Sequence, residues 1–412
     1  MSEFRYSSPG DRSDSATIWH RRIMYCFTLA MMAMSWPIWH ASGPIPRFPV
    51  IGLESFAARN ASIDSIALIS CLAGLVLGLT KGRAGRFGAS IAAVSGLLLI
   101  LIDQNRLQAW FYQTLVLSSV YALLPASSAI GFVRFFAVAL YFHSALSKLD
   151  WSFSHSMGPY LLSPILSRLP FALDARTQAG VALPLPIGEM AFALALTCGL
   201  WRIGLAGATI MHVGLMALLG PWALDHSGNV LLWNVSMLIQ AWILFRSPLS
   251  QTKSEIVAEG AQADDSGKIM SEPPPAALGV VQLGLLAVAL LPFFERAGLW
   301  DPWPSFALYA GHVEQLRIDW PAELRGEIPA EFQPFLKQDN DDLVLDLTLW
   351  SRARFGVPPY PASRIHRRLA AWIAAACPEG IPMRATFLSK ANWRTGSRDE
   401  RTLSSTQAIR NR

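Results

Sequence analysis

The sequence predicts an all-α polytopic membrane protein of about nine transmembrane helices, followed by a small soluble α+β domain at the C-terminus. Hydrophobic residues make up 52% of the 412 residues and charged residues only 15%, whereas an ordinary soluble protein has about 25% charged residues. The hydrophobic residues form blocks close to the roughly 17 to 25 residues that cross a bilayer. After residue 300 the blocks end, and the composition becomes that of a soluble domain.

The first apolar block, 23–39, follows Arg21 and Arg22, as the core of a signal peptide would. No small-x-small cleavage site comes after Trp39, so we interpret the block as an uncleaved signal anchor. Eight further spans are predicted at 63–80, 87–102, 110–124, 130–147, 182–200, 203–219, 230–246 and 277–294. The shorter ones fit a bundle in which neighbouring helices cover the helix ends.

The charges of the loops predict the orientation. With a cytoplasmic N-terminus, Lys and Arg in the short loops favour the cytoplasmic side by roughly two to one. We therefore expect a multi-pass protein of the bacterial inner (plasma) membrane, with a cytoplasmic N-terminus and a non-cytoplasmic C-terminal domain. The expected parts are a cytoplasmic segment 1–22, a bundle 23–250, a flexible linker 251–275, a last span 276–299 and a soluble domain 300–412.

Some expected elements lie outside the spans. Met157–Leu166 has apolar residues at helical spacing but is too short to span, so it predicts a helix at the membrane interface. In the C-terminal domain, Val313–Trp320 alternates as a half-buried strand does, Arg364–Cys377 predicts a helix, and Pro382–Phe387 predicts a closing strand. The polar residues from Thr395 onward are expected to be frayed.

Several functional classes are excluded. The excess positive charge is divided among loops and forms no single basic face, so we expect no nucleic-acid partner. The four cysteines are scattered and form neither a CxxC pair nor a zinc pattern. His143 and His212 stand alone on different spans, so we predict no metal site.

Ionisable and amide side chains inside predicted spans are costly and usually mark a site, a pair or a pathway. Nearly every candidate falls in the predicted outer half of the membrane, which predicts a polar pocket open toward the outer leaflet. The alternative is that Lys148 and Arg106 snorkel while Glu189 and His212 bond one another to hold helices together. The candidates are Asp103, Asn105, Arg106, Gln108, His143, Lys148, Glu189, His212 and Asn234.

The run Tyr141–Asp150 (YFHSALSKLD) resembles the membrane segment of vitamin K-dependent gamma-carboxylases and the wider HTTM and DoxX-like group. The run Asp103–Trp110 is similar to the Asp-x-Asn-His element of that family, and His212 fits its later histidine region. The resemblance implies that Lys148 is a base acting on a quinone-like molecule, with Arg106 and His143 orienting the ligand. Arg106 stands where the carboxylases have histidine and the large lumenal domain is missing, so peptide carboxylation is not expected.

These observations lead to a first hypothesis, an HTTM-like membrane protein whose outward-facing pocket binds a quinone-like or lipid-like molecule. Lys148, Arg106 and His143 would be its catalytic residues, and the other candidates would bind the ligand. The alternative is a non-catalytic membrane partner in redox or assembly work, as the DoxX and MauE relatives suggest, for example as a partner of a thiol oxidoreductase. A transporter is a third hypothesis, but the sequence lacks the inverted repeat expected of that class.

Overall fold

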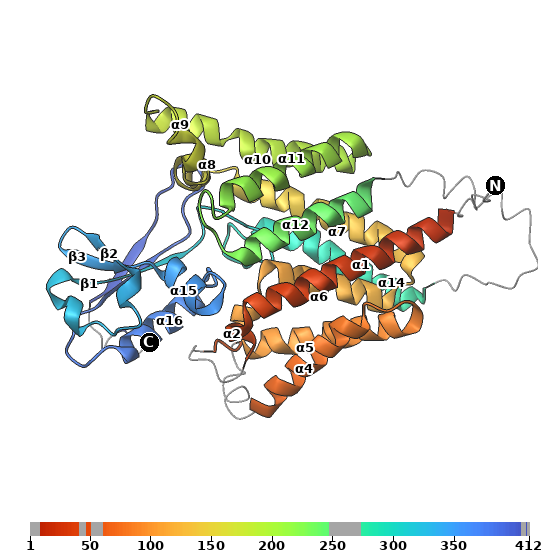
Figure 1. Cartoon of the computed structure of the whole chain (residues 1–412), viewed down its shortest axis with the longest axis horizontal. Coiled ribbons are helices and arrows are strands. Elements are labelled where there is room, and N and C mark those ends of the chain that lie inside the picture. The colour runs from red at the N-terminus through yellow and green to blue at the C-terminus, as the bar shows by residue number, and fades with distance from the viewer. Residues whose placement is uncertain (1–8, 41–46, 51–60, 247–272, 405–408, 410–412) are drawn as a thin grey trace, which may run out of the picture.

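The chain folds into a long helical bundle with a smaller domain at one end, in a computed structural model that describes residues 9–40, 47–50, 61–246, 273–404 and 409 (Figure 1). The bundle consists of α1 (Pro9–Met34), α4 (Ala61–Leu77), α5 (Gly82–Ile102), α6 (Ala109–Leu123), α7 (Ala126–Lys148), α10 (Pro184–Thr197), α11 (Trp201–Leu219), α12 (Gly228–Phe245) and α14 (Pro275–Leu290). Each of these helices overlaps one of the nine predicted spans. Most of the predicted linker 251–275 lies outside the described residues.

Six helical stretches within the described ranges are long and apolar enough to cross a membrane, so this is a helical membrane protein. They are Gly82–Ile102, Ala126–Lys148, Ala175–Thr197, Trp201–Leu219, Gly228–Phe245 and Pro275–Phe294. Their outward faces carry exposed apolar residues, such as Val94 at 72% and Leu283 at 69% exposure. The helices α1, α4 and α6 are shorter or less apolar, so the total of nine spans stays a prediction.

The bundle helices alternate in direction, and one end of the bundle is free of the C-terminal domain (Figure 1). At that free end, the start of α1 contacts two turns between other helices. Arg21 and Arg22 donate to the backbone oxygens of Thr80 and Leu79, each at 2.7 Å, and Thr17 donates to the oxygen of Ala126 at 2.8 Å. The helix thus begins well before the predicted boundary at residue 23, because its polar first turns are anchored to these carbonyls.

Hydrogen bonds and a close helix contact stabilise the interior of the bundle. Side chains of α1 pair with those of α6, as in Tyr25–Ser118 at 2.9 Å and Thr28–Thr114 at 2.7 Å. Between α4 and α5, a Cβ placed on Gly74 would lie 2.6 Å from the backbone nitrogen of Ala92. Glycine is therefore needed for this backbone approach, and small residues are typical of helix contacts in membranes.

Short helices follow α7 at the end nearer the domain. The expected helix at Met157–Leu166 is present as α8 (Gly158–Leu166), preceded by a π-helical turn, η2 (Phe153–Met157). A further helix, α9 (Ala175–Ala182), leads into α10 with almost no break.

The C-terminal domain contains a five-stranded antiparallel sheet of order β2-β3-β1-β4-β5. The strands are β1 (Gln315–Pro321), β2 (Leu336–Asp339), β3 (Asp342–Leu345), β4 (Arg384–Leu388) and β5 (Glu400–Leu403), and the helices are α15 (Leu347–Phe355) and α16 (Ser363–Ala376). The predicted strands and helix correspond to β1, α16 and β4. The expectation that residues after Thr395 fray is wrong for Glu400–Leu403, because these residues pair with β4 along the sheet edge.

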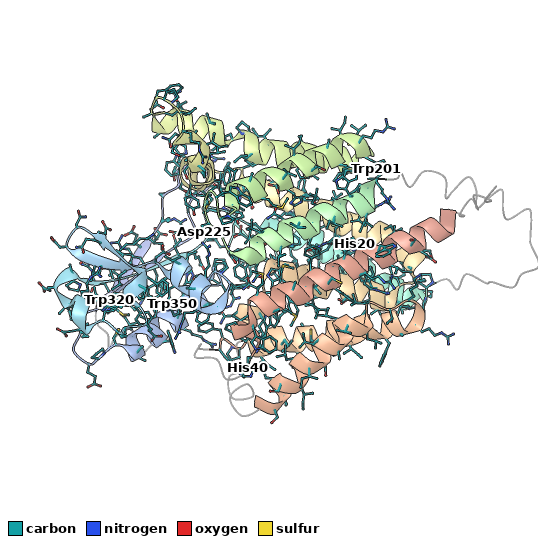
Figure 2. The ribbon with its side chains drawn as sticks, in the orientation of Figure 1. His20, His40, Trp201, Asp225, Trp320 and Trp350 are labelled. Carbon is teal, nitrogen blue, oxygen red and sulfur yellow. The ribbon has the colours of Figure 1, made fainter. Side chains whose placement is uncertain are left out.

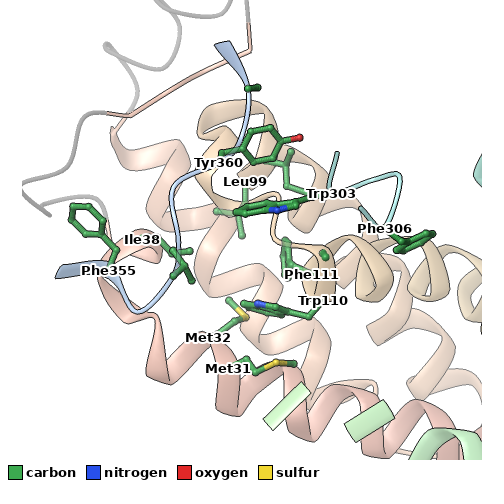
Figure 3. Close-up of a cluster of buried hydrophobic side chains, with 14 of the residues drawn as sticks. Met31, Met32, Ile38, Leu99, Trp110, Phe111, Trp303, Phe306, Phe355 and Tyr360 are labelled. Atoms are coloured by element: carbon green, nitrogen blue, oxygen red, sulfur yellow. The ribbon is translucent and has the colours of Figure 1, made fainter. Parts of the chain in front are cut away.

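The apolar core runs without a break from the bundle into the domain. Trp303 and Tyr360 of the C-terminal region lie near Phe111 of α6 in the same apolar cluster (Figure 3). The Phe306 ring meets Phe136 of α7 edge-on, with the ring centroids 5.6 Å apart. The domain is therefore docked on the bundle rather than tethered beside it.

Polar contacts reinforce the docking. Arg352 of α15 donates to the backbone oxygen of Asp225 at 2.5 Å, at the border between bundle and domain (Figure 2). Ser227 donates to the backbone oxygen of Gly356 at 3.0 Å. Trp320 and Trp350, by contrast, are buried within the domain itself (Figure 2).

Candidate functional site

A cavity of about 740 Å³ lies where the bundle meets the C-terminal domain. Its walls come from α7, α10, α11 and α12, and its roof comes from Trp303, Tyr309 and Val357 of the C-terminal region. Most lining side chains are apolar, and the volume falls within the range of about 300 to 1,000 Å³ that is common for small-molecule sites. The few polar groups in the walls therefore decide what the cavity can bind.

The strongest polar feature is a buried ion pair between Lys148 and Glu189. The Lys148 Nζ lies 2.7 Å from Glu189 Oε2, and the two side chains are 10% and 8% exposed. The same Nζ donates to the backbone oxygen of Ser144 at 3.0 Å and to its Oγ at 2.7 Å. All three ammonium protons are thus in use. Among the described residues, Glu189 Oε1 receives no hydrogen bond.

A second polar chain crosses three helices. The hydroxyl of Tyr141 on α7 lies 3.0 Å from His212 Nε2 on α11, and His212 Nδ1 lies 2.9 Å from Asn234 Oδ1 on α12. The Asn234 Nδ2 donates to the backbone oxygen of Val230 at 2.9 Å, so its Oδ1 accepts from His212. His212 then donates through Nδ1 and accepts the Tyr141 proton at Nε2. This assignment makes His212 a neutral imidazole that fixes the relative positions of three helices.

The expected direct pair of Glu189 and His212 is not present. Glu189 bonds Lys148, while His212 bonds Tyr141 and Asn234. The sequence placed all of these groups at similar depth, but depth does not determine which neighbours face one another around a bundle.

Five of the nine candidate residues line the cavity: Gln108, Lys148, Glu189, His212 and Asn234. The other four, Asp103, Asn105, Arg106 and His143, do not. Asp103 accepts from the backbone nitrogens of Phe48 and Asn105, and the backbone oxygen of Asn105 accepts from Gln108 Nε2 at 2.8 Å. These two residues therefore shape the turn between α5 and α6.

Arg106 is 1% exposed and is fully bonded away from the cavity. It forms a two-pronged ion pair with Asp64 of α4 and donates to the backbone oxygens of Ile38 and Trp39 at 2.9 and 3.1 Å. His143 bonds the backbone oxygen of Ala289 on α14 at 2.9 Å. The positions of Arg106 and His143 favour helix-anchoring roles over contact with a cavity ligand.

Three residues at these sites were absent from the predicted set. Tyr141 and Ser144 lie in the run that carries the family resemblance, two turns and one turn before Lys148 respectively, and this spacing could have placed them on the same helix face. Asp64 stands alone within a predicted span, and an isolated carboxylate in such a span itself signals a buried partner.

The roof of the cavity is uncharged at neutral pH. His226, in the loop between α11 and α12, lies beside Tyr309 with ring centroids 5.5 Å apart. Burial, followed by the charge of Arg352, lowers the pKa of His226 to about 4. The cavity thus has one ion pair in its wall and neutral groups above it.

The exposed lining residues of the cavity indicate an opening at the side of the bundle, beside α10 and α11. Apart from Thr348, these residues are Pro184, Leu185 and Gly188 of α10 and Ile210 of α11. Gly188 and Gly214 have no atom within 4 Å of the position that a Cβ would occupy. The opening is therefore bordered by apolar side chains and by glycines with open space beside them.

A separate polar cluster joins the domain to the bundle. His312 Nδ1 lies 2.6 Å from Asp150 Oδ2, and His312 Nε2 lies 2.9 Å from Glu295 Oε2. Burial alone lowers the pKa of His312, but the hydrogen bonds and charges of the two carboxylates outweigh burial and raise this pKa above its usual value. Lys390 Nζ lies 2.7 Å from Glu295 Oε1 and completes the cluster.

Within the described ranges, no three or more His, Cys, Asp and Glu residues are grouped so as to hold a metal ion. No family model, no curated protein and no solved structure matches the chain. The resemblance to the gamma-carboxylase and HTTM group therefore depends on the short runs that contain Lys148 and Asp103.

Proposed function

We propose that this membrane protein binds an amphipathic molecule of the lipid or quinone class in the cavity beneath the C-terminal domain. The observation that carries the proposal is a mainly apolar cavity that holds one buried ion pair and opens between α10 and α11. An apolar body would fill the cavity, while a polar head would reach Glu189 and the Tyr141–His212–Asn234 chain.

The side opening supports a ligand that arrives from the bilayer. Ile210 at the opening is 74% exposed, as expected for a residue that faces lipid. A molecule already dissolved in the membrane would pass such an apolar opening without leaving an apolar environment. We further propose that this opening lies in the outer leaflet of a bacterial inner membrane, with the N-terminus in the cytoplasm and the C-terminal domain outside.

Glu189 and Lys148 are the charged groups that a polar head of the ligand would meet in the cavity. The family resemblance implies that Lys148 is the base, but its three protons are all donated within the protein. Glu189 Oε1 is the atom that can accept a hydrogen bond from a hydroxyl of the ligand. We propose that the ion pair acts as one unit, in which Glu189 contacts the ligand and Lys148 compensates the charge.

Mass spectrometry of the purified protein tests the binding proposal. A lipid or quinone should co-purify with the wild-type chain in stoichiometric amount, and Gly188→Trp or Gly214→Trp should reduce its content severalfold by filling the opening. Gly284→Trp is the matched control, because Gly284 lies in α14 with no atom within 4 Å of its Cβ position and does not line the cavity. An empty wild-type cavity, or stoichiometric co-purification of a thiol oxidoreductase in place of a lipid, would contradict the proposal.

The role of Lys148 requires a separate test. Lys148→Arg keeps a positive charge beside Glu189, but arginine does not lose its proton at useful pH. If Lys148 only compensates charge, this variant keeps its ligand content and its activity in a complementation assay. Loss of activity with normal expression and normal ligand content would instead assign the base to Lys148 itself.

A further inference from the structure

A second cavity, of about 450 Å³, lies at the junction of the last membrane helix and the C-terminal domain. It shares no lining residue with the first cavity. Its lining is mainly polar and includes Arg296, Lys390, Asn392, Ser397, Arg398 and Asp399. The lining also includes His312, which is held between Asp150 and Glu295. The remaining charged groups of the lining are three Lys and Arg side chains and one carboxylate, so we ask which of these cations has a counter-charge.

Lys390 has a carboxylate partner, but the two arginines do not. Lys390 pairs with Glu295 at 2.7 Å. Arg398 donates to the backbone oxygens of Gly311, Val313 and Ser389. Arg296 donates to the backbone oxygens of Leu146 and Leu149 at 2.8 and 3.4 Å. Within the described part of the chain, neither guanidinium has a carboxylate oxygen within 4 Å.

Backbone carbonyls hold these guanidiniums in position but carry no net charge. Burial lowers the pKa of Arg398, and the more distant Asp150 opposes this shift only in part. Both arginines are only partly buried, and a partly buried cation without a counter-charge favours an anion beside it. Guanidinium groups in a fixed orientation suit the oxygen atoms of a phosphate particularly well, because each can donate two parallel hydrogen bonds.

The surroundings of the pocket indicate where such an anion would come from. Trp393, which lines the pocket, is 48% exposed, and Phe294 and Leu299 near the end of the last span are 50% and 74% exposed. The backbone nitrogen of Trp151 donates to the backbone oxygen of Trp393 at 2.9 Å and joins this loop to the end of α7. Exposed aromatic residues beside the end of a span are typical of the level of lipid head groups.

We propose that this pocket binds a phosphate group through Arg296, Arg398 and Lys390. The phosphate belongs either to the head group of an anionic phospholipid or to a soluble phosphate. The same three cationic side chains would bind the phosphate oxygens in both cases. Occupation of the pocket would neutralise the two arginines and hold the loop that contains Ser397 against the last membrane helix.

The test compares two probes on the purified full-length protein. Short-chain phosphatidylglycerol and inorganic phosphate are titrated separately, and binding is measured by calorimetry and by the shift of the thermal unfolding midpoint. Binding of both probes indicates a soluble phosphate site, and binding of phosphatidylglycerol alone indicates a lipid head-group site. Phosphatidylcholine, which has the phosphate but no net charge, should bind much more weakly than phosphatidylglycerol.

Variants test the pocket itself. Ser397→Asp places a carboxylate among the arginines and should weaken binding of the probe by about tenfold or more, as expected when charge-assisted hydrogen bonds are lost. Ser397→Asn is the matched control, with nearly the same shape and no charge, and should keep the wild-type affinity. Arg296→Gln should weaken binding by a similar factor, whereas Arg394→Gln, on the same loop but outside the lining, should change it less than about twofold.

These variants keep the proposal testable even if Arg398 proves necessary for folding. Equal affinities for the Ser397→Asp and Ser397→Asn proteins would overturn it. Failure of wild-type protein to bind either probe would overturn it as well. Neither result bears on the proposed ligand of the first cavity, because the ligand content of that cavity is measured separately by mass spectrometry.

Discussion

At the scale of single residues, His312 has the environment that responds most directly to pH. Its imidazolium donates to Asp150 and Glu295, and Lys390 and Arg398 are the nearby cations. The pKa of His312 is raised in the folded protein. Its contribution to stability is therefore complete below the unfolded pKa of about 6.5 and is lost as the pH rises through the higher folded value.

We therefore predict that the contact between domain and bundle weakens as the pH rises above about 6.5. Hydrogen exchange of the backbone around β1 and the end of α14 measures this contact. His312→Gln should remove the pH dependence in this range and give the weaker contact at every pH. A pH dependence that persists in that variant would assign the effect to another group.

The identities of the candidate residues could be predicted from the sequence, but most of their pairings could not. A lysine, a glutamate and a histidine inside apolar blocks are visible in the sequence, and all three line one cavity. Their partners depend on how far each helix is rotated about its axis, which loop charges and hydropathy do not report. This is why Lys148 is bonded to Glu189 while Arg106, expected to lie nearby, is bonded to Asp64.

At the scale of helices, the contact between α4 and α5 depends on glycine. A Cβ on Gly74 would lie 2.6 Å from the nitrogen of Ala92 and 2.9 Å from the oxygen of Gly88, both of which are backbone atoms that cannot turn away. We predict that Gly74→Ala destabilises the protein by about 1 to 3 kcal/mol, as overpacking usually does. Thermal unfolding in detergent measures the change.

Gly284→Ala is the control with the opposite expected sign. Gly284 lies inside α14 with open space at its Cβ position, so alanine should stabilise the helix by about 0.5 to 1 kcal/mol through its better helix propensity. If Gly74→Ala left the stability of the protein in detergent unchanged, α4 would be able to move away from α5 at little cost.

Elements with a strong local pattern were predictable, and elements defined by their neighbours were not. The apolar blocks predicted a helix at each of nine places, and β1 and α16 followed from their periodicity. The strand β5 is short and mostly exposed, so no apolar alternation marks it. Only its pairing with β4 makes it a strand, and such pairing is a tertiary contact.

At the scale of the whole molecule, the C-terminal domain and the start of α1 lie at opposite ends of the bundle (Figure 1). Because the loop charges place the N-terminus in the cytoplasm, we predict that the domain is outside. In a background without the exposed Cys26 and Cys198, Gln338→Cys on β2 should react with an impermeant maleimide in intact cells. Arg83→Cys, at the other end, should react only after the membrane is permeabilised, and the reverse pattern would invert the orientation.

The roof of the first cavity belongs to the C-terminal domain, whereas its walls belong to the membrane helices. A molecule that touches both parts is thermodynamically linked to their association, so that its binding free energy adds to the free energy of docking. By reciprocity, whatever loosens the docking lowers the affinity for that molecule by the same factor. His312 does not line the first cavity, so its deprotonation as the pH rises would act as an effector that releases the ligand of that cavity into the bilayer.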